Sequence, residues 1–200
     1  MVKHLLFAMR HGQTGWNAEG RFQGRSDHSL TALGRCQAKE SGEKLKAHVE
    51  RLGLDPSRIA LYASPLRRAR ETIDAVVLEM GIPGSRINID TRLAEASFGR
   101  WEGMTTLEVK ASFPVERRLR KLDRWNFRSH GGDSYADLAR LMESFLADLH
   151  PGQPALVVSH AGNIKVMAGM LAGLTGEQTM AFSVPHGALL YWDERQLAWI

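Results

Sequence analysis

The sequence predicts an α/β fold, in which a mostly parallel central sheet lies between two layers of helices. Three short apolar runs, at residues 5–9, 59–63 and 155–159, have the length and composition of buried strands. A turn and a segment with helical periodicity follow these runs, and this alternation is typical of a three-layer α/β/α sandwich. The chain has 200 residues, which is enough for one such domain, so we expect residues 1–200 to form a single domain.

The composition is that of an ordinary globular protein, with 44% apolar residues. The single cysteine, Cys36, allows no internal disulfide and no cysteine cluster for a metal, and it predicts a cytoplasmic location. The first predicted strand begins too early to leave room for a signal peptide, and no apolar run approaches the roughly 20 residues that cross a bilayer. We therefore expect no membrane association. The net charge of +4 fits a small anionic ligand, and no motif predicts nucleic-acid binding.

The first apolar run ends at Arg10 and His11, and the chain then turns at Gly12 and Gly15. A strand end followed by a glycine-bearing loop is where open α/β sheets bind their ligands. Arginine can hold two phosphate oxygens at once, and a neutral histidine nitrogen carries a lone pair that can attack phosphorus. The pair therefore indicates a phosphoryl site, although such a pair can also be an ordinary polar strand end.

A polar stretch at residues 17–30 leads from this loop to the first long helix. Thr31 is a favourable N-cap for that helix, and Gly53 with Pro56 is expected to end it. Apolar residues at helical spacing mark its buried face, namely Ala38, Leu45, Val49 and Leu52.

The second apolar run is followed by Ser64 and Pro65, which we expect to begin a helix because proline suits the first helical turn. Arg67, Arg68 and Arg70 lie close to this helix start, where free N–H groups and the helix dipole attract an anion. An arginine here can bind that anion or can simply be solvated. We accept the solvated state for Arg67 and Arg70.

Residues 87–89 are predicted to form a short third strand, and residues 96–133 an excursion that covers the site. Part of this excursion, at 117–128, is strongly basic. Two interpretations stay open for the basic stretch: a cap that recognises an anionic substrate, or a solvated helix face.

The last third of the chain contains the clearest strand, at 155–159, which ends at His160 and leads into another helix. Before it, Ser134 and Asp137 have the spacing of a capping box, and Tyr135 is expected to be a core residue of the helix that they begin. The last strand is predicted at 188–192. His186, just before it, is interpreted as a turn residue.

Four stretches of the chain resemble the motifs of one family. Residues 10–17, which read R-H-G-Q-T-G-W-N, resemble the R-H-G-x-T-x-W-N motif of the histidine phosphatase superfamily, also called phosphoglycerate mutase-like. Residues 64–72, 93–103 and 157–162 are similar to its S-P-L-x-R-A-x-x-T, L-x-E-x-x-F-G-x-W-E-G and V-x-S-H-G-G motifs, in the family order. The resemblance spans residues 5–192 and implies the phosphoglycerate mutase-like fold.

The resemblance also implies a role for particular residues. His11 is then the nucleophile, Glu95 the general acid, and Arg10, Arg68 and His160 the groups that stabilise the phosphoryl charge. Further phosphate-binding groups are implied at Asn17, Gln23, Gly24 and Ala161, and Ser64 is implied to orient His11. A general acid is needed because the leaving alkoxide requires a proton that arginine cannot supply. Glu102 is the competing carboxylate, with a structural role in the turn as its simpler explanation.

The predicted function is hydrolysis of a small phosphorylated metabolite by a phosphomonoesterase, through a phosphohistidine and without a metal or another cofactor. A cofactor-dependent phosphoglycerate mutase is the main alternative. Phe98 and Thr106 stand where mutases carry a tyrosine and a lysine, which favours the phosphatase, whereas the pair Arg117-Arg118 is similar to a mutase arginine pair.

Three other sequence features bear on the function and its partners. An inactive phospho-ligand binding module is less favoured because His11 and Glu95 are both present. A metallohydrolase with His11 and His160 as ligands is disfavoured by the adjacent arginines. Ala161 stands where the family motif more commonly has glycine, and an alanine there disfavours a positive φ. A monomer or a homodimer is expected.

Overall fold

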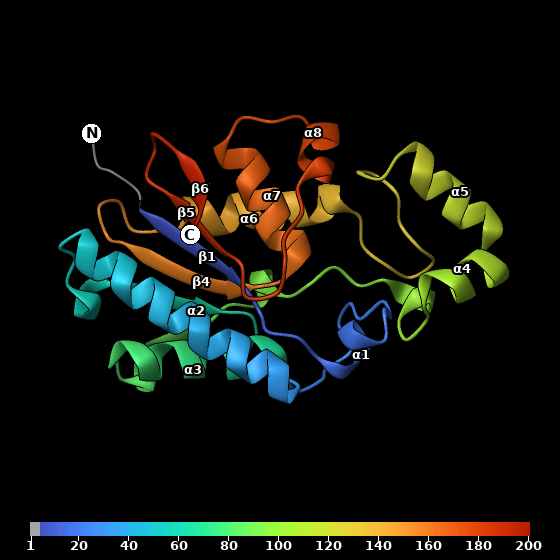
Figure 1. Ribbon diagram of the computed structural model, residues 1–200. Helices are drawn as coiled ribbons and strands as arrows, with labels where there is room; N and C mark the ends of the chain where they lie inside the picture. Colours follow the sequence, from blue (N-terminus) through green and yellow to red (C-terminus); the bar gives the residue numbers. More distant parts are fainter. Residues whose placement is uncertain (1–4) are drawn as a thin grey trace.

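The computed structural model describes residues 5–200, and a six-stranded sheet forms its centre (Figure 1). The strands lie in the order β3-β2-β4-β1-β5-β6. Their bounds are Leu6–Arg10 (β1), Ala60–Ala63 (β2), Ile87–Ile89 (β3), Ala155–Ser159 (β4), Leu189–Trp192 (β5) and Leu197–Trp199 (β6). Strands β1 to β4 are parallel, whereas β5 and β6 pair in the antiparallel sense, so the predicted mostly parallel sheet is confirmed.

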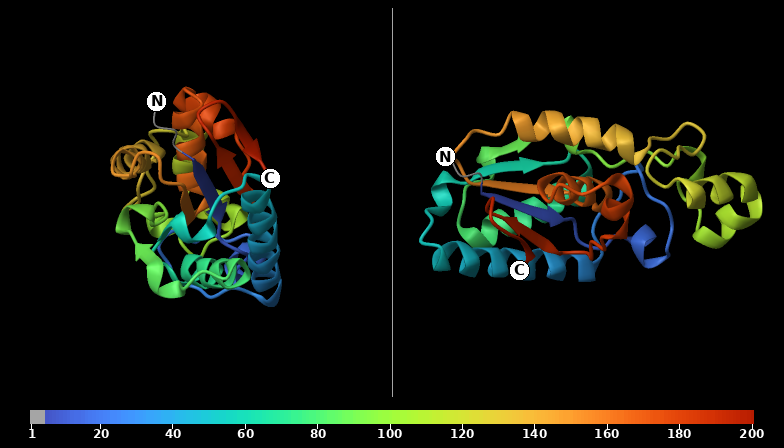
Figure 2. Two further views of the ribbon diagram at one scale, coloured as in Figure 1. Left: turned by 90° about the vertical axis from the view of Figure 1, so that its left-hand side faces the viewer. Right: turned by 90° about the horizontal axis from the view of Figure 1, so that it is seen from above.

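Helices cover both faces of this sheet (Figures 1 and 2). Helices α2 (Ala32–Arg51) and α3 (Arg67–Met80) pack on one face, and α6 (Tyr135–Ala147) and α7 (Ala161–Leu171) pack on the other. The predicted three-layer α/β/α sandwich is therefore confirmed.

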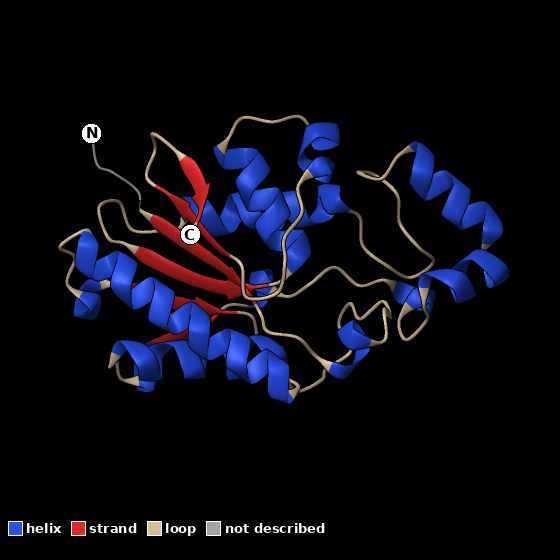
Figure 3. Ribbon diagram, viewed as in Figure 1, coloured by secondary structure: helices blue, strands red, loops and turns tan. Residues whose placement is uncertain are grey.

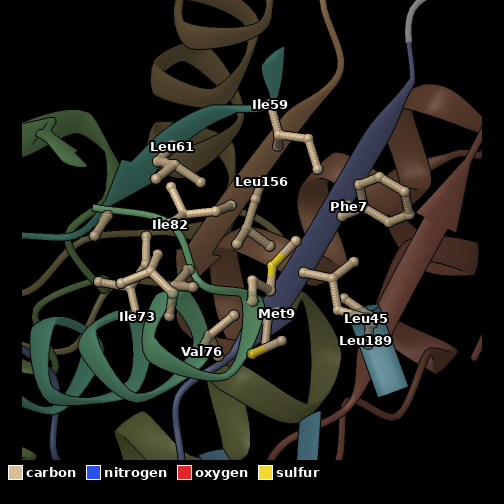
Figure 4. Packing of buried hydrophobic residues seen from close by; sticks show 14 of the residues in the cluster. Phe7, Met9, Leu45, Ile59, Leu61, Ile73, Val76, Ile82, Leu156 and Leu189 are labelled. Carbon is tan, nitrogen blue, oxygen red and sulfur yellow. The ribbon is translucent and has the colours of Figure 1, made fainter. Parts of the chain in front are cut away.

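Strand β1 is buried on both faces, which explains its unbroken apolar sequence. Phe7 and Met9 belong to the hydrophobic cluster beneath α2 and α3, and Figure 4 shows them beside Leu45. Leu6 and Ala8 belong to the cluster on the opposite face. Packing on both sides holds the strand in place, and with it the polar residues at and just after its C-terminal end.

Two of the predicted helix caps are present. The Thr31 hydroxyl accepts a hydrogen bond from the Gly34 N–H at 3.0 Å, and Ser134 forms a capping box with Asp137. Two details differ from the prediction. Helix α3 begins at Arg67 with Leu66 as its N-cap, so Pro65 precedes the helix instead of lying in its first turn. Strand β6, a short edge strand, was not predicted.

The remaining helices are short (Figure 3). They are α1 (Gly15–Ala18), α4 (Thr106–Ser112), α5 (Pro114–Leu122) and α8 (Gly176–Ala181), with 3₁₀ turns at Pro56–Arg58, Gly84–Arg86, Thr91–Leu93 and Gly99–Trp101. Within residues 5–200, no helix is both long enough and apolar enough to cross a membrane.

Helices α4 and α5 project beyond the sheet at one end of the molecule (Figures 1 and 2). The segment that carries them leaves and rejoins the body at one place, where the Asp133 N–H donates to the Ser97 carbonyl at 2.8 Å. Near its return, Trp125 packs closely on the start of α8, where a Cβ at Gly176 would lie only 2.6 Å from the indole ring. The segment is thus attached at its base, at Trp125 and at the loop before α2, where the Phe22 N–H donates to the Met104 carbonyl at 2.9 Å and the Gly103 N–H donates to the Phe22 carbonyl at 2.8 Å.

Candidate active site

The ends of two neighbouring strands bring His11 and His160 together. Strands β1 and β4 are paired so that Arg10 lies opposite Ser159, and the His11 N–H donates to the Ser159 carbonyl at 3.0 Å. Each histidine is the first residue after its strand. The two imidazole rings are consequently adjacent, with centroids 5.1 Å apart.

The His11 ring is held in one orientation and in its neutral form. Its Nδ1 lies 2.7 Å from the Gly12 carbonyl oxygen, to which Nδ1–H donates, so the lone pair is on Nε2. Burial lowers the pKa of His11 well below the usual histidine range, and the charges of Arg68 and Arg10 lower it further. The ring therefore has an unprotonated Nε2 at neutral pH, as a nucleophile requires.

Arg68 lies between the two histidines. It comes from the first turn of α3 and is 1% exposed. Its Nε–H is shared between His11 Nε2 at 3.2 Å and His160 Nδ1 at 3.3 Å. Its terminal nitrogens donate to the backbone carbonyls of Ser26 and Gly24. These contacts aim a permanent cation at the nitrogen that would attack phosphorus.

Ser64 orients His160 and not His11, which corrects the sequence-based expectation. Because His160 Nδ1 accepts from Arg68, the proton of the neutral ring is on Nε2, and Nε2 donates to the Ser64 hydroxyl oxygen at 2.7 Å. The reason is the order of the strands, since β2, which ends just before Ser64, pairs directly with β4 and not with β1. Burial also lowers the pKa of His160 well below its usual range.

Arg10 is only partly satisfied by the protein. One terminal nitrogen donates to the Val184 carbonyl at 2.5 Å, while its buried Nε has no hydrogen-bond partner within residues 5–200. Burial lowers the pKa of Arg10 to about 10, so the side chain stays charged at neutral pH. A buried guanidinium with an unused donor is suited to bind an anion.

Glu95 lies beside this pair of arginines, with its carboxylate oxygens accepting from the N–H groups of Ala96 at 3.0 Å and Gly162 at 3.3 Å. Burial raises the pKa of Glu95 above its usual range, and the Ala96 hydrogen bond and the charge of Arg68 act against that rise. The raised pKa favours a carboxyl that can hold and deliver a proton.

The other candidate phosphate-binding residues lie around the same loop. The Asn17 side-chain oxygen accepts from the Thr14 N–H at 3.1 Å, which leaves its amide NH₂ as the donor for a ligand. Gln23 is buried and donates to the Thr14 hydroxyl at 3.0 Å. Gly24 has a φ of +52° and directs its carbonyl to Arg68, while its Cα faces the carboxylate of Glu102.

The structure also shows the local roles of Ala161 and Glu102. Ala161 is the first residue of α7 and needs no positive φ, so the alanine causes no backbone strain. The Glu102 carboxylate accepts hydrogen bonds from the chain on both sides of the turn, from Arg25, Ser26, Ser97 and Phe98. It therefore ties two loops together, which is the structural role expected for it.

The sequence interpretation missed three residues near the site. His186, interpreted as a turn residue, lies with its ring centroid 5.6 Å from that of His11. Tyr135 packs on the core as expected but also interacts with the charges of Glu95 and Arg120. Lys165 is buried on α7, and a lysine on a helix that is apolar apart from Asn163 was the signal that could have identified it.

The described part of the chain contains no group of three or more His, Cys, Asp or Glu side chains that could hold a metal ion. Two arginines, Arg10 and Arg68, and two histidines, His11 and His160, form the polar centre of the site.

Comparisons with known proteins agree with this arrangement. A glucosyl-3-phosphoglycerate phosphatase of Mycolicibacterium vanbaalenii is 37% identical over 180 residues, which cover 84% of this chain and 74% of that protein. A 2,3-bisphosphoglycerate-dependent phosphoglycerate mutase of Nitrobacter winogradskyi is 31% identical over 193 residues, which cover 94% and 90%. The structure of a mycobacterial glucosyl-3-phosphoglycerate phosphatase in complex with VO3 superposes with a TM-score of 0.80 at 26% identity, covering 98% of this chain and 96% of that one.

The sequence pattern of one family matches residues 6–196, which is nearly the whole chain and includes the strand ends, Arg68, Glu95 and His160. The chain therefore belongs to the histidine phosphatase superfamily (branch 1).

Proposed function

We propose that this protein hydrolyses phosphate monoesters of a small metabolite through a phosphohistidine formed on His11. The observation that carries the proposal is the His11 ring itself, whose neutral Nε2 faces Arg68 at 3.2 Å and whose Nδ1–H is engaged by a carbonyl. A nucleophile that is already deprotonated, beside a fixed cation, is suited to attack a phosphate dianion.

In the first step, His11 Nε2 attacks phosphorus and the bond from phosphorus to the alcohol oxygen breaks. Arg10 and Arg68 stabilise the charge on the three equatorial oxygens, with the Asn17 amide as a further donor. His160, whose Nδ1 accepts from Arg68 and whose Nε2–H donates to Ser64, positions Arg68 for this role. Glu95 delivers its proton to the leaving oxygen. The N–H of Ala161 at the start of α7 and the Gly24 region of the loop complete the phosphate site.

In the second step, water attacks the phosphohistidine and returns His11 to its neutral form. Glu95 is now a carboxylate and accepts the proton of that water, by microscopic reversibility. No step calls for a metal ion, because the arginines supply the positive charge around the phosphoryl group.

The excursion at residues 96–133 covers this site in our proposal and contacts the alcohol portion of the substrate. Its base lies next to Glu95, and Arg117, Arg120 and Arg124 line a hollow of about 410 Å³ within it. A small phosphorylated metabolite fits these dimensions better than a macromolecule does.

A phosphoglycerate mutase remains the second candidate, because the Nitrobacter relative is named as one and because Arg117 lines the hollow in the excursion. Against it, Thr106 occupies the same hollow where the mutase motif implies a lysine. In a mutase the phosphoryl group returns to the product, whereas in a phosphatase it passes to water.

One experiment tests the function and separates these two candidates. The protein is incubated with ³²P-labelled phosphate esters, and released phosphate, isomerised ester and acid-labile phosphoprotein are measured. We expect phosphate release with a transient phosphoprotein, and neither in His11→Ala, while His150→Ala, at an exposed position, behaves as the wild type. Interconversion of 2- and 3-phosphoglycerate faster than phosphate release would favour the mutase.

A further inference from the structure

Helix α5 presents a stripe of apolar side chains to solvent. Val115, Leu119 and Leu122 are 69%, 52% and 76% exposed, and none of them belongs to either hydrophobic cluster of the described chain. At about 100° per residue, their spacing places all three within an arc of about 60° on the helix surface. Large apolar side chains that gather on one exposed face are typical of a surface that binds another body.

A different side of α5 holds the helix to the rest of the protein. The Trp101 indole N–H donates to the Glu116 carboxylate at 3.0 Å, and the Arg120 guanidinium lies over the rings of Phe22, at 5.6 Å, and Trp101, at 5.8 Å. Polar and charged side chains of α5 thus make its inward contacts, while its apolar side chains face away from the protein. This is the reverse of the usual arrangement in a surface helix.

The stripe lies in a strongly basic part of the chain. Residues 114–128 hold six basic and two acidic side chains, so their net charge of +4 equals that of the whole chain. Arg118 and Lys121 border the stripe on one side, are exposed, and form no ion pair within residues 5–200. On the other side, the Asp123 carboxylate accepts from the backbone N–H and the side-chain amide of Asn126, both at 2.9 Å. An apolar line with unpaired cations beside it favours an anionic, amphipathic surface.

A lipid surface fits this face better than a second copy of the chain does. In a two-fold dimer the same face would meet itself, and the Arg118 and Lys121 side chains of the two copies would repel each other. An interface of anionic lipids attracts these cations and takes up apolar side chains without a matching groove. Helix α5 lies at the extremity of the molecule, where a flat surface can reach it (Figures 1 and 2).

We propose that the outer face of α5, formed by Val115, Arg118, Leu119, Lys121 and Leu122, docks on membranes that contain anionic lipids. The sequence-based expectation of no membrane association rested on the lack of a spanning segment. A helix that lies in the membrane interface needs only one apolar face and neighbouring cations. Because the stripe is short, the binding is weak and reversible. This inference goes beyond the proposed hydrolase function and does not depend on it.

Vesicle flotation with the full-length protein tests the docking. Neutral vesicles of phosphatidylcholine are compared with vesicles in which about a third of the lipid is anionic phosphatidylglycerol. We expect the partition coefficient to be about 25-fold higher on the anionic vesicles, because each of two cations near such a surface contributes about fivefold. The difference should shrink when added salt shortens the Debye length.

A double variant tests the apolar part of the face. Leu119→Gln/Leu122→Gln should lower the partition coefficient at least about tenfold, because two leucines no longer enter the interface. The control is Leu33→Gln/Leu78→Gln, which replaces two leucines of matched exposure, 53% and 76%, on α2 and α3. It should bind as the wild type does.

A second double variant tests the charged part. Arg118→Gln/Lys121→Gln should lower binding to anionic vesicles by about 25-fold and leave binding to neutral vesicles unchanged. Lys44→Gln/Lys46→Gln removes the same charge from exposed positions of α2 and should keep the wild-type preference. Thermal unfolding of each variant verifies that it is folded.

Amide hydrogen exchange locates the docked face in the wild type without any substitution. We expect anionic vesicles to slow exchange in residues 114–122. Four outcomes would overturn the proposal: no binding to anionic vesicles, equal binding to both vesicle types, full binding by Leu119→Gln/Leu122→Gln, or slowed exchange only elsewhere. A dimer without vesicles that Leu119→Gln/Leu122→Gln dissociates, measured by sedimentation equilibrium, would instead assign the stripe to a second copy of the chain.

Discussion

At the scale of single residues, the two proposed reacting groups, His11 and Glu95, have pKa shifts in opposite directions. His11 is kept deprotonated by burial and by two arginines, whereas the carboxyl of Glu95 is made easier to protonate by burial. A nucleophile and an acid that start in the states the reaction needs avoid a proton transfer before each turnover.

Glu95→Gln keeps the shape of the side chain but can neither give nor take a proton. We expect turnover of an alkyl phosphate to fall by about 10²–10⁴-fold, the usual contribution of general acid–base catalysis. p-Nitrophenyl phosphate has a good leaving group, so its phosphorylation step should be affected less and phosphohistidine should accumulate. Rapid-quench labelling measures this. Unchanged activity on alkyl phosphates would exclude Glu95 as the acid and direct attention to Glu102.

The pH profile of kcat/KM for an alkyl phosphate follows from the same two shifts. Activity needs neutral His11 and is lost as pH falls through its pKa, which lies well below 6.5, so the acid limb should lie below the ordinary histidine range. Activity also needs protonated Glu95 and is lost as pH rises through its pKa, which is raised above 4.5. Steady-state rates across pH measure both limbs. Glu95→Gln should remove the alkaline limb, and a limb that persists in this variant would assign it to another group.

At the scale of elements, helix α2 supports the loop that carries His11. The Gln13 N–H donates to the Gln37 side-chain oxygen at 2.9 Å, and the Gly12 N–H donates to Thr72 of α3 at 3.1 Å. Gly34 in the first turn of α2 touches the backbone of Gln13, and a Cβ at Gly34 would overlap the Gln13 carbonyl. At Gly34 the helix therefore meets the loop backbone to backbone.

Gly34→Ala should therefore displace this loop. We expect a destabilisation of about 1–3 kcal/mol, typical of overpacking, together with a loss of activity because His11 moves. The control is Gly84→Ala, whose Cβ meets no atom within 4 Å and whose φ is not positive, so its stability should be unchanged or slightly higher. Urea denaturation and p-nitrophenyl phosphate turnover measure the two effects. If both variants behave alike, the contact of Gly34 is not what holds the loop.

At the scale of the whole molecule, the proposed anion site should couple ligand binding to stability. A ligand that binds only the folded protein adds about 2.7 kcal/mol at 100 times its Kd. For a chain of this size that corresponds to a Tm increase of about 5–10 °C. We expect inorganic phosphate or vanadate to produce this shift and to inhibit turnover, and Arg10→Gln to abolish the shift.

Thermal unfolding with phosphate and turnover, both repeated in EDTA, separate the phosphohistidine mechanism from a metallohydrolase. Activity and the shift caused by phosphate should both survive the chelator, because arginine and histidine side chains provide the anion site. Activity that disappears in EDTA and returns with zinc or magnesium would instead support the metallohydrolase.

The sequence predicted those parts of the fold whose signal is local. The apolar runs that became β1 and β4 are continuous because these strands are buried on both faces, while β2 is buried on one face and half-buried on the other. The caps at Thr31 and Ser134 are set by a few neighbouring residues. Strand β6 was missed because it is short and half exposed at an edge. Its pairing with β5 depends on tertiary structure that a local pattern does not contain.

The candidate site was predictable to the same degree. His11, Arg68, Glu95 and His160 lie in motifs, and the structure brings them together. The partner of Ser64 depends on which strands are neighbours, and the positions of His186 and Lys165 depend on how the last third of the chain folds back. A periodic pattern of apolar residues identifies the buried face of a helix. It cannot show that one residue on that face lies beside a charged side chain from a distant part of the chain.

The register of β1 and β4 separates two kinds of change that this protein could undergo in evolution. Because the two histidines follow strands paired at Arg10 and Ser159, their spacing does not depend on the long stretch of chain between them. The segment with α4 and α5 is attached at its base, at Trp125 and at the loop before α2, so its length and charge could change between these points while the strand ends that carry the two histidines stay as they are. New substrates would then be acquired through changes in this one segment, without changes in the residues around His11 and His160.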